Sequence, residues 1–598
     1  MKTSFKVLLL SSVLIAISAP ALAQNAPLQY AKQGWTEDQR QAFYTTSQGS
    51  HMMPYAWYKE LRRLDVDQPF GGDQLQRYGY LPNEKSPNWN PEGLPVGFVI
   101  DGDAATGFIG MTCAACHTGQ IEYVKNGVTQ QLRIDGAPTM ANFQLFLTEL
   151  TAAAKAALND AGRFDAFAHA VLGAQFSQAG ADTLKGDFKK WVDEFGGFMD
   201  KSLPVSSPWG PGRLDAFGMI FNRVAGLDLG IQDNIKLADA PVSYPFLWNA
   251  SRQDKTQWNG GVPNGLYLNA LGRNTGEVFG VFAHFGPSKL PTLPGLPTLV
   301  DFRDNSVSYS GLQAHEESIA ALGPPPWPFD VNQDLVNSGR VLFALHCASC
   351  HDKQLLPTGT WYTPVKAVGT DEKMFRNSLR KSDTGRLEGA LSLNPPGSRL
   401  AKTDLTVNIL ATSVVGTLLS AAFPIPPKIP PDLEHGFWRA ITLDAADLLA
   451  NEQTTPSLAT VLNLTVDPGK REALKAHIKD RLANMFIPPN PDAAAAYESR
   501  VLYGIWATAP YLHNGSVPNL AELLRWPGNR SPSFMVGSRK YDVDNVGYMT
   551  TESPFKDGTL VVGAGAQPGN SNAGHKYPAD WELTDDERKA LLEYLKTL

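Results

Sequence analysis

The chain has 598 residues and a formal net charge of −7 at pH 7, and 43% of its residues are hydrophobic. A chain of this length favours two or more domains over a single core. No cluster of lysine and arginine falls on a predicted helix, which argues against nucleic acid or an anionic membrane surface as the main partner. The 53 glycines and 44 prolines predict extensive loops.

The first residues have the features of a secretory signal peptide. Lys2 and Lys6 precede an apolar run at residues 7–19, and Ala21-Leu-Ala23 follows. The run of about 13 residues is shorter than the roughly 20 that cross a membrane. We therefore expect cleavage near Ala23, no transmembrane anchor after cleavage, and a periplasmic or secreted protein.

The sequence then predicts helices separated by a loop-rich stretch. Residues 53–61 are typical of a short capped helix with Pro54 near its first turn. Residues 78–110 are rich in proline, glycine and asparagine, which predicts loops and short strands. Apolar residues recur with helical spacing over 137–158, and more helix is expected at 161–200.

All four cysteines fall in two copies of the motif C-x-x-C-H. The copies are Cys113-Ala-Ala-Cys116-His117 and Cys347-Ala-Ser-Cys350-His351. Two thiols one helical turn apart can bond to the two vinyl groups of one haem, and the imidazole of the next residue can reach the iron. In an exported chain without other cysteines, the motifs predict two covalently bound haem c groups, with His117 and His351 as proximal ligands.

An aromatic and glycine-rich region, residues 203–300, lies between the two motifs. A long stretch of this kind is seldom a mere linker. We expect it, and especially residues 244–282, to wall the first haem. The run Gly323-Pro-Pro-Pro-Trp-Pro328 is stiff and marks the clearest boundary, so the predicted domains are residues 24–323 and 324–598.

The second predicted domain has the parts of a cytochrome c domain with a large insertion. A helix at about 334–345 runs into the second motif, and Thr584 and Glu587 form the capping box of a terminal helix. Residues 407–427 carry no charge and are interpreted as a buried helix rather than a substrate-contacting surface. The expected fold class is mainly α with extensive loops and little β, arranged as two cytochrome c-type haem domains with large insertions.

The sixth ligand of each iron separates an electron carrier from a catalyst, because an open position admits oxygen or peroxide. For the second haem His513 is the preferred candidate, since it lies between an aromatic turn and an Asn-Gly turn that fix its backbone. A loop histidine that serves a hydrogen bond is an equal alternative. The competing residues are Met485, Met535, Met549 and His575. His575 could instead hydrogen-bond a propionate, and His346 is expected to lie at the surface or to serve packing.

Several stretches resemble a known superfamily. Ala507-Thr-Ala-Pro-Tyr-Leu-His-Asn-Gly-Ser516, the run 569–577 and the two C-x-x-C-H motifs resemble the di-haem cytochrome c peroxidase superfamily. Within it, residues 47–58, 258–260 and 533–539 resemble the branch of the bacterial rubber oxygenases and the related di-haem fatty-acid dioxygenases. The resemblance covers most of residues 45–598.

The resemblance implies a division of labour between two haems. The N-terminal haem would bind dioxygen with His117 as its single protein ligand, and the C-terminal haem would be held by His351 and His513. The distal face would be aromatic, with Trp248, Trp258, Phe279 and Phe282 as candidates. A calcium ion between the haem domains is common in the wider superfamily, but its ligands are not legible. Glu277, Asp101 and Asp103 are the candidates for a peroxidase acid.

Three functions follow as hypotheses. The first is an exported dioxygenase that adds O2 to a double bond of an unsaturated apolar substrate, with a fatty acid favoured over polyisoprene because of the size of the chain. The second is a cytochrome c peroxidase that reduces peroxide with electrons from a small donor protein. The third is a non-catalytic di-haem electron carrier with both irons six-coordinate.

Overall fold

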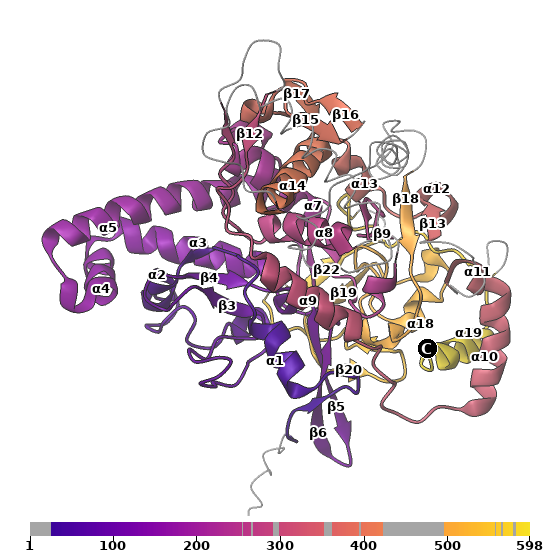
Figure 1. Ribbon diagram of the computed structural model, residues 1–598. Coiled ribbons are helices and arrows are strands. Elements are labelled where there is room, and N and C mark those ends of the chain that lie inside the picture. Colours follow the sequence, from indigo (N-terminus) through magenta and orange to yellow (C-terminus); the bar gives the residue numbers. More distant parts are fainter. Residues whose placement is uncertain are drawn as a thin grey trace, which may run out of the picture.

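The computed structural model describes residues 26–253, 255–264, 267–290, 298–351, 361–393, 396–422, 495–556, 558–563, 566–577 and 582–598. Helices hold more of these residues than strands do, and loops join many short elements (Figure 1). The prediction of a mainly α chain with extensive loops is therefore confirmed, although many short segments also pair as small sheets. The expected signal peptide and Met485 lie outside the described residues.

Two small sheets flank the first cysteine motif in the sequence. Strands β2 (Met53–Pro54), β4 (Phe108–Met111) and β3 (Phe98–Asp101) form an antiparallel sheet, and β4 ends one residue before the turn that carries Cys113. The motif is followed by β5 (Thr118–Lys125) and β6 (Val128–Asp135), a hairpin that projects at the bottom of Figure 1. Strand β1 (Gln29–Tyr30) pairs in parallel with β6. The motif is thus held between two sheets.

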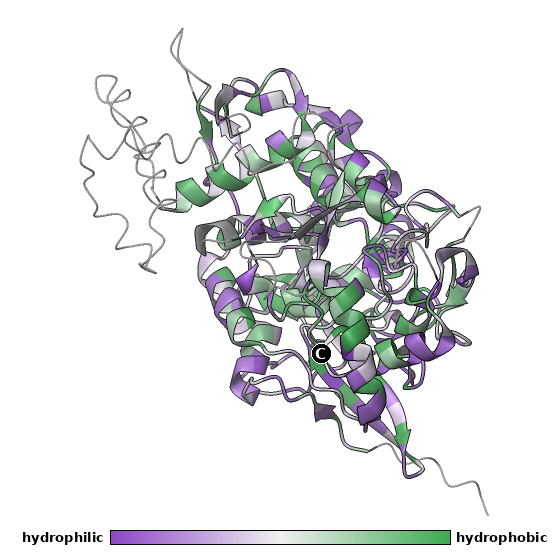
Figure 2. Ribbon diagram, turned by 90° about the vertical axis from the view of Figure 1, so that its right-hand side faces the viewer, coloured by the Kyte–Doolittle hydropathy of each residue, from purple (hydrophilic) through white to green (hydrophobic). Residues whose placement is uncertain are grey.

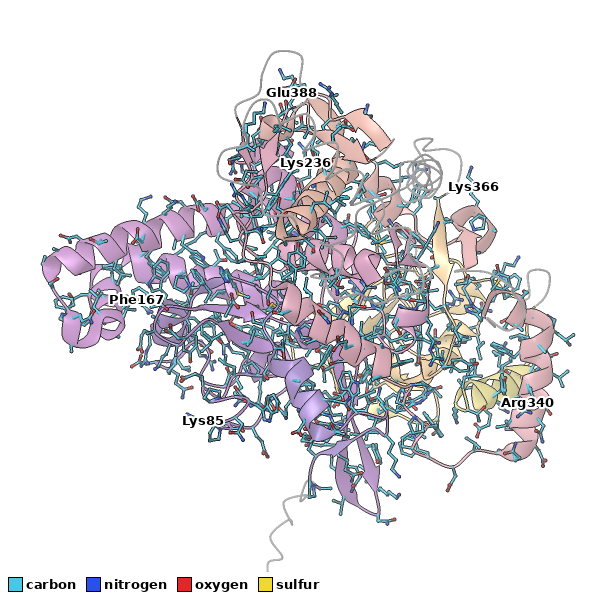
Figure 3. All side chains as sticks on the ribbon, viewed as in Figure 1. Lys85, Phe167, Lys236, Arg340, Lys366 and Glu388 are labelled. Carbon is cyan, nitrogen blue, oxygen red and sulfur yellow. The ribbon has the colours of Figure 1, made fainter. Side chains whose placement is uncertain are left out.

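A helical arm follows the hairpin and extends to the left of Figure 1. It consists of α3 (Phe143–Asn159), α4 (Ala161–Leu172), α5 (Gln178–Trp191) and α6 (Gly197–Ser202), which confirms the helices expected in this stretch. Helix α3 begins at Phe143 because the side chain of Asn142 accepts a hydrogen bond from the amide of Leu145. Phe167, labelled in Figure 3, lies in the arm and packs on Phe188 with 4.8 Å between ring centroids.

The centre of the molecule contains three helices packed around a glycine-rich one. Helix α8 (Tyr267–Gly280) lies beside α7 (Ala216–Phe221), α9 (Tyr309–Ala321) and α14 (Thr406–Ala422). Gly276 on α8 faces Val414 of α14, and a Cβ added there would lie 3.5 Å from the Val414 side chain, an ordinary van der Waals distance. None of the helices in the described ranges combines the length and apolarity needed to cross a bilayer.

The second cysteine motif is carried by a helix pair at the right of Figure 1. Helix α10 (Gln333–His346) packs on the terminal helix α19 (Asp585–Leu595) and continues through Cys347 into α11 (Ala348–His351). The predicted capping box of Thr584 and Glu587 is present. Arg340, labelled in Figure 3, lies on α10 with its guanidinium 6.0 Å from the ring centroid of Tyr594.

The other elements are short. They are α1 (Glu37–Thr45), α2 (Tyr55–Glu60), β7 (Arg213–Leu214), β8 (Val242–Ser243), β9 (Lys255–Thr256), β10 (Val262–Pro263), β11 (Ser288–Lys289), β12 (Val300–Asp301), β13 (Trp361–Pro364), α12 (Val365–Val368), α13 (Lys373–Ser378), β14 (Lys381–Asp383), β15 (Leu391–Leu393), β16 (Pro396–Arg399), β17 (Thr403–Leu405), β18 (Ala496–Ser499), α18 (Leu520–Leu523), β19 (Ser533–Met535), β20 (Tyr541–Asp542), β21 (Gly547–Tyr548) and β22 (Thr559–Val561). In Figure 2 the hydrophobic residues concentrate on the helices of the interior, and many outer segments are hydrophilic.

Candidate functional site

The first motif forms a tight turn that brings its two thiols and its histidine together. Residues Cys113–Ala115 form a 3₁₀ turn, and the side chain of Thr112 accepts a hydrogen bond from the amide of Ala114. The amides of Cys116 and His117 both donate to the carbonyl of Cys113, at 3.3 and 3.0 Å. Burial raises the pKa of the Cys116 thiol to about 12, so the thiol is neutral. The turn therefore has the arrangement that attachment of one haem requires.

The imidazole of His117 is buried and neutral. Burial lowers the pKa of His117 to about 4, against the opposing effect of the Pro245 carbonyl. Its Nδ1 is buried without a hydrogen bond of normal geometry, and the ring of Tyr244 stands edge-on at 6.0 Å. A neutral imidazole has the chemistry of an iron ligand. The neutral ring of His117 beside the two thiols thus fits the group that the motif predicts.

The second motif repeats this geometry. The amides of Cys350 and His351 donate to the carbonyl of Cys347, at 3.1 and 3.0 Å. The Nδ1 of His351 lies 2.7 Å from the carbonyl oxygen of Arg500 and donates to it. This bond fixes the tautomer in which Nε2 keeps its lone pair, as in many metal-ligating histidines. Burial lowers the pKa of His351, so its ring is also neutral.

A cavity of about 200 Å³ opens beside the second motif. Its wall includes Cys347, Cys350 and His351 and three further histidines, His346, His513 and His575. Segments from both predicted domains contribute to it: Ser243 to Phe246 and Trp258 from the first, and Leu591 and Leu595 of α19 from the second. Two thiols, a proximal histidine and a second imidazole are the donors that a six-coordinate haem c needs. The residues present therefore fit that group.

His575, and not His513, makes the ring contact with His351. The centroids of the His351 and His575 rings are 6.2 Å apart. A metal–imidazole bond of about 2 Å places two rings on opposite sides of one metal roughly 6 Å apart. The described residues show no ring contact between His351 and His513; the His513 ring packs on Tyr497 at 4.3 Å. The geometry thus favours His575 over the pair expected from the sequence.

His513 remains part of the cavity wall. Burial lowers its pKa to about 3, and its ring makes no hydrogen bond within the described part of the chain. The sequence predicted the loop that carries His513, but it could not give the distance between the rings of His513 and His351. Met535 and Met549 are not among the described residues that line the cavity, whereas His346 is.

The four distal candidates lie in four different surroundings. Trp258 lines the cavity of the second motif, and its indole nitrogen donates to the carbonyl of Ser243 at 2.9 Å. Trp248 is fully buried and stacks on Phe246. Phe279 is fully buried in the core between α8 and α14, 4.6 Å from Phe285. Phe282 belongs to the apolar cluster against which Cys116 packs. Phe282 and Trp248 thus each belong to an apolar cluster against which a cysteine of the first motif packs, Cys116 for Phe282 and Cys113 for Trp248.

The acidic candidates also differ. Asp101 accepts hydrogen bonds from His51 and Ser47, and these bonds lower its pKa. The carboxylate of Asp103 accepts hydrogen bonds within its own exposed turn. Glu277 accepts a hydrogen bond from Gln257 at 2.7 Å, and its charge raises the pKa of the Cys113 thiol. Burial raises the pKa of Glu277 itself. Glu277 is therefore the acid that lies toward the first motif.

No group of three or more histidine, cysteine, aspartate or glutamate side chains suited to a metal ion is found among the described residues. A calcium ion stays a prediction.

Residues 496–535, which include His513, match the family model described as RoxA-like, cytochrome c-like. This match supports haem c binding and an oxidoreductase. The chain is also 30% identical to the uncharacterized protein y4iJ of Sinorhizobium fredii over 98% of this chain and 96% of that protein. The uncharacterized protein y4iM of the same organism is 24% identical over 59% of this chain and 63% of that protein. The chain therefore belongs to the same family as y4iJ and carries a segment of the RoxA-like, cytochrome c-like type.

Proposed function

We propose that the protein is an exported di-haem c-type dioxygenase that adds O2 to a double bond of an unsaturated apolar substrate, with a fatty acid favoured over polyisoprene. The observation that carries the proposal is the difference between the two motifs. His351 faces a second imidazole, that of His575. His117 has its ring contact with Tyr244 and, among the described residues, none with a second histidine. The first haem would be the open one.

The residues around each motif have separate tasks in this proposal. Cys113 and Cys116 would attach the catalytic haem and His117 would ligate its iron, which supplies the site for dioxygen activation when bound. Phe282 and the apolar cluster around Cys116 would exclude water and hold the substrate. Cleavage of a carbon–carbon double bond by O2 into two carbonyl groups consumes no external electrons, so the reaction needs no donor protein in each turnover.

The proposal is tested by product analysis under isotopic dioxygen. Holoprotein is incubated with oleate and, separately, with polyisoprene in an atmosphere of ¹⁸O2, and the products are identified by mass spectrometry. We expect two labelled oxygen atoms in the products of oleate. The absence of label from both substrates, together with consumption of peroxide and of a reduced cytochrome donor, would contradict it.

The coordination is tested by spectroscopy of the reduced protein. Carbon monoxide is expected to bind one haem and to leave the second in its six-coordinate low-spin state. We propose His351 and His575 as the ligands of the second haem, so His575→Gly should let carbon monoxide bind both haems. The matched variant His513→Gly should bind it at one haem only. Two haems that both ignore carbon monoxide in the unaltered protein would contradict an open first site.

A peroxidase is the second candidate, and the Glu277–Gln257 pair favours it. Reduction of peroxide needs an acid that can move a proton between the two oxygen atoms. Glu277 has the raised pKa of such an acid and lies toward the first motif. Glu277→Gln should lower peroxide turnover by roughly 10²- to 10⁴-fold if this reaction is the physiological one. Unchanged peroxide turnover in Glu277→Gln, with labelled products from oleate, would favour the dioxygenase.

A further inference from the structure

The loop that carries His575 has a strained backbone. His575 adopts a φ of +53° and Gly574 a φ of +95°, and a Cβ added at Gly574 would lie 2.6 Å from the Cα of Thr370. Residues other than glycine seldom adopt positive φ, and such a conformation persists only where the surroundings fix it. The histidine that faces His351 is therefore placed by contacts outside its own residue.

One buried arginine supplies most of these contacts. Nη1 of Arg530 donates to the carbonyls of Asn572 and Gly574 at 2.8 and 2.9 Å. Its Nη2 donates to the carbonyls of His575 and Leu523 at 3.3 and 3.0 Å. The carbonyls of Asn572, Gly574 and His575 belong to the loop that carries His575, and Leu523 lines the cavity wall. Arg530 thus joins the loop to the wall of the cavity that its histidine enters.

The guanidinium is used for geometry and not for charge pairing. Arg530 is 6% exposed, and its four recorded acceptors are all backbone carbonyls. A buried cation without a bonded carboxylate is costly, and a planar fork of fixed donors is the property that lysine cannot reproduce. The amide of His575 adds one further bond, to the carbonyl of Val368 at 2.9 Å.

We propose that Arg530 is a positioning residue that holds His575 facing His351, where the two imidazoles would ligate the iron of the second haem. The inference rests on the proposed ligation by His575. Without the four bonds, the loop would relax from its strained conformation and withdraw the imidazole, while Cys347, Cys350 and His351 would keep the haem attached.

A second arginine offers a matched control. Arg213 is also fully buried, and its Nη1 donates to the carbonyl of Asn514 and to the side chain of Asn570 at 3.0 and 2.9 Å. Arg213 therefore joins the His513 loop to Asn570, five residues before His575, with the same chemistry and without a bond to residues 572–575. Replacing it tests whether the loss of any buried guanidinium near the cavity disturbs ligation, or only the loss of Arg530.

The experiment compares holoproteins that carry R530Q, R530K, R213Q and H575G. Electron paramagnetic resonance and the near-infrared charge-transfer band report ligation of each haem, and carbon monoxide binding counts the open sites. R530Q is expected to lose the low-spin signal of one haem and to regain it on addition of imidazole, as H575G does. R213Q is expected to keep the low-spin signal. Hydrogen exchange at residues 566–577 should be faster in R530Q than in R213Q.

The outcomes are distinct. If H575G keeps a low-spin second haem, the proposed ligation fails and the inference falls with it. If H575G loses that signal but R530Q keeps it, the role of Arg530 alone is wrong. Equal loss in R530Q and R213Q would show a general disturbance of the cavity and would also overturn it. If R530Q does not fold, R530K decides, because it retains the charge but loses most of the bonds; an unchanged low-spin signal in R530K overturns the proposal.

Discussion

Phe282 holds a backbone conformation that bulky residues rarely adopt, with a φ of +79°. Its carbonyl accepts a hydrogen bond from the amide of His51 at 3.1 Å, and its ring is 5.1 Å from that of Phe195. Residues held in this way cluster at functional sites. The constraint therefore marks Phe282, rather than its neighbours in sequence, as the aromatic residue to test at the first motif.

Replacement of two phenylalanines by leucine separates a site residue from a core residue. Phe282→Leu should lower product formation from oleate by roughly tenfold or more, because misplaced substrate reacts slowly. Phe279→Leu should leave the rate near that of the unaltered protein and cost less than about 1.5 kcal/mol of stability, since the swap nearly conserves volume. Rates are measured by mass spectrometry and stability by urea unfolding. Equal rate losses would assign both residues to the site.

A buried aspartate predicts a pH dependence of stability away from the haem motifs. Burial raises the pKa of Asp228 to about 7, against the opposing effect of Arg223 at 3.1 Å, and its Oδ2 has no hydrogen bond. An acid whose pKa is raised on folding stabilises the folded state most at low pH and loses this contribution as the pH rises toward 7.

Asp228→Asn removes this titration. The stability of the unaltered protein relative to the variant should fall by about 2 kcal/mol between pH 5 and pH 7 and change little above pH 7. Urea unfolding of both proteins at several pH values measures the difference, and the contributions of other groups cancel. A constant difference across this range would show that Asp228 is ionised in the folded protein at pH 5.

At the scale of elements, the pair α10 and α19 depends on one glycine. A Cβ added at Gly339 on α10 would lie 2.0 Å from the carbonyl oxygen of Ala590 and 2.8 Å from the Cβ of Tyr594. Backbone atoms cannot move aside as a flexible side chain can, so the helices would have to separate. Because α10 runs directly into the second motif, its position sets that of Cys347.

Two glycine-to-alanine replacements test this packing. Gly339→Ala should destabilise the protein by about 1–3 kcal/mol, as an overpacked contact does. Gly186→Ala is the control, because no atom lies within 4 Å of its added Cβ on the exposed face of α5; it should stabilise the helix by up to about 1 kcal/mol. Thermal unfolding followed by circular dichroism measures both. A neutral Gly339→Ala would show that α10 and α19 can separate without cost.

The elements near the ends of the motifs were predictable from the sequence, because caps and cysteine spacing are local signals. Thr584 and Glu587 placed the start of α19, and both C-x-x-C-H turns form as expected. Which of His513 and His575 contacts the ring of His351 was not predictable, because it depends on the packing of segments that are far apart in sequence. The place of Trp258 in the second cavity depends on the same long-range packing.

At the scale of the whole molecule, the two predicted domains are tied by buried hydrogen bonds. The indole of Trp248 donates to the carbonyl of Tyr503 at 2.6 Å, the amide of Ser243 donates to the carbonyl of His513 at 2.9 Å, and Arg213 reaches Asn514. Buried bonds of this kind cost free energy when one partner is removed. The halves should therefore behave as one body.

Cleavage of the connection between the halves tests this behaviour. A specific protease site inserted after the exposed Asp330, between α9 and α10, allows the chain to be cut in the folded protein. The two fragments should elute together from a size-exclusion column in buffer and separate only in denaturant. Separation in buffer would mean that the described contacts do not hold the halves together.

The mixed origin of the second cavity has a consequence for biogenesis. The hydrogen-bond and ring partners of the first motif, among them Gln48, Thr112 and Tyr244, precede residue 300. The second cavity needs Ser243 to Phe246 from early in the chain and Leu591 and Leu595 from its last helix. As the polypeptide emerges from its N-terminus, the first haem pocket can close while the second still lacks a wall. Under the proposed function, haem attachment would then proceed in a fixed order, and a chain cut short before α19 would have the contacts of the first motif but an incomplete second cavity.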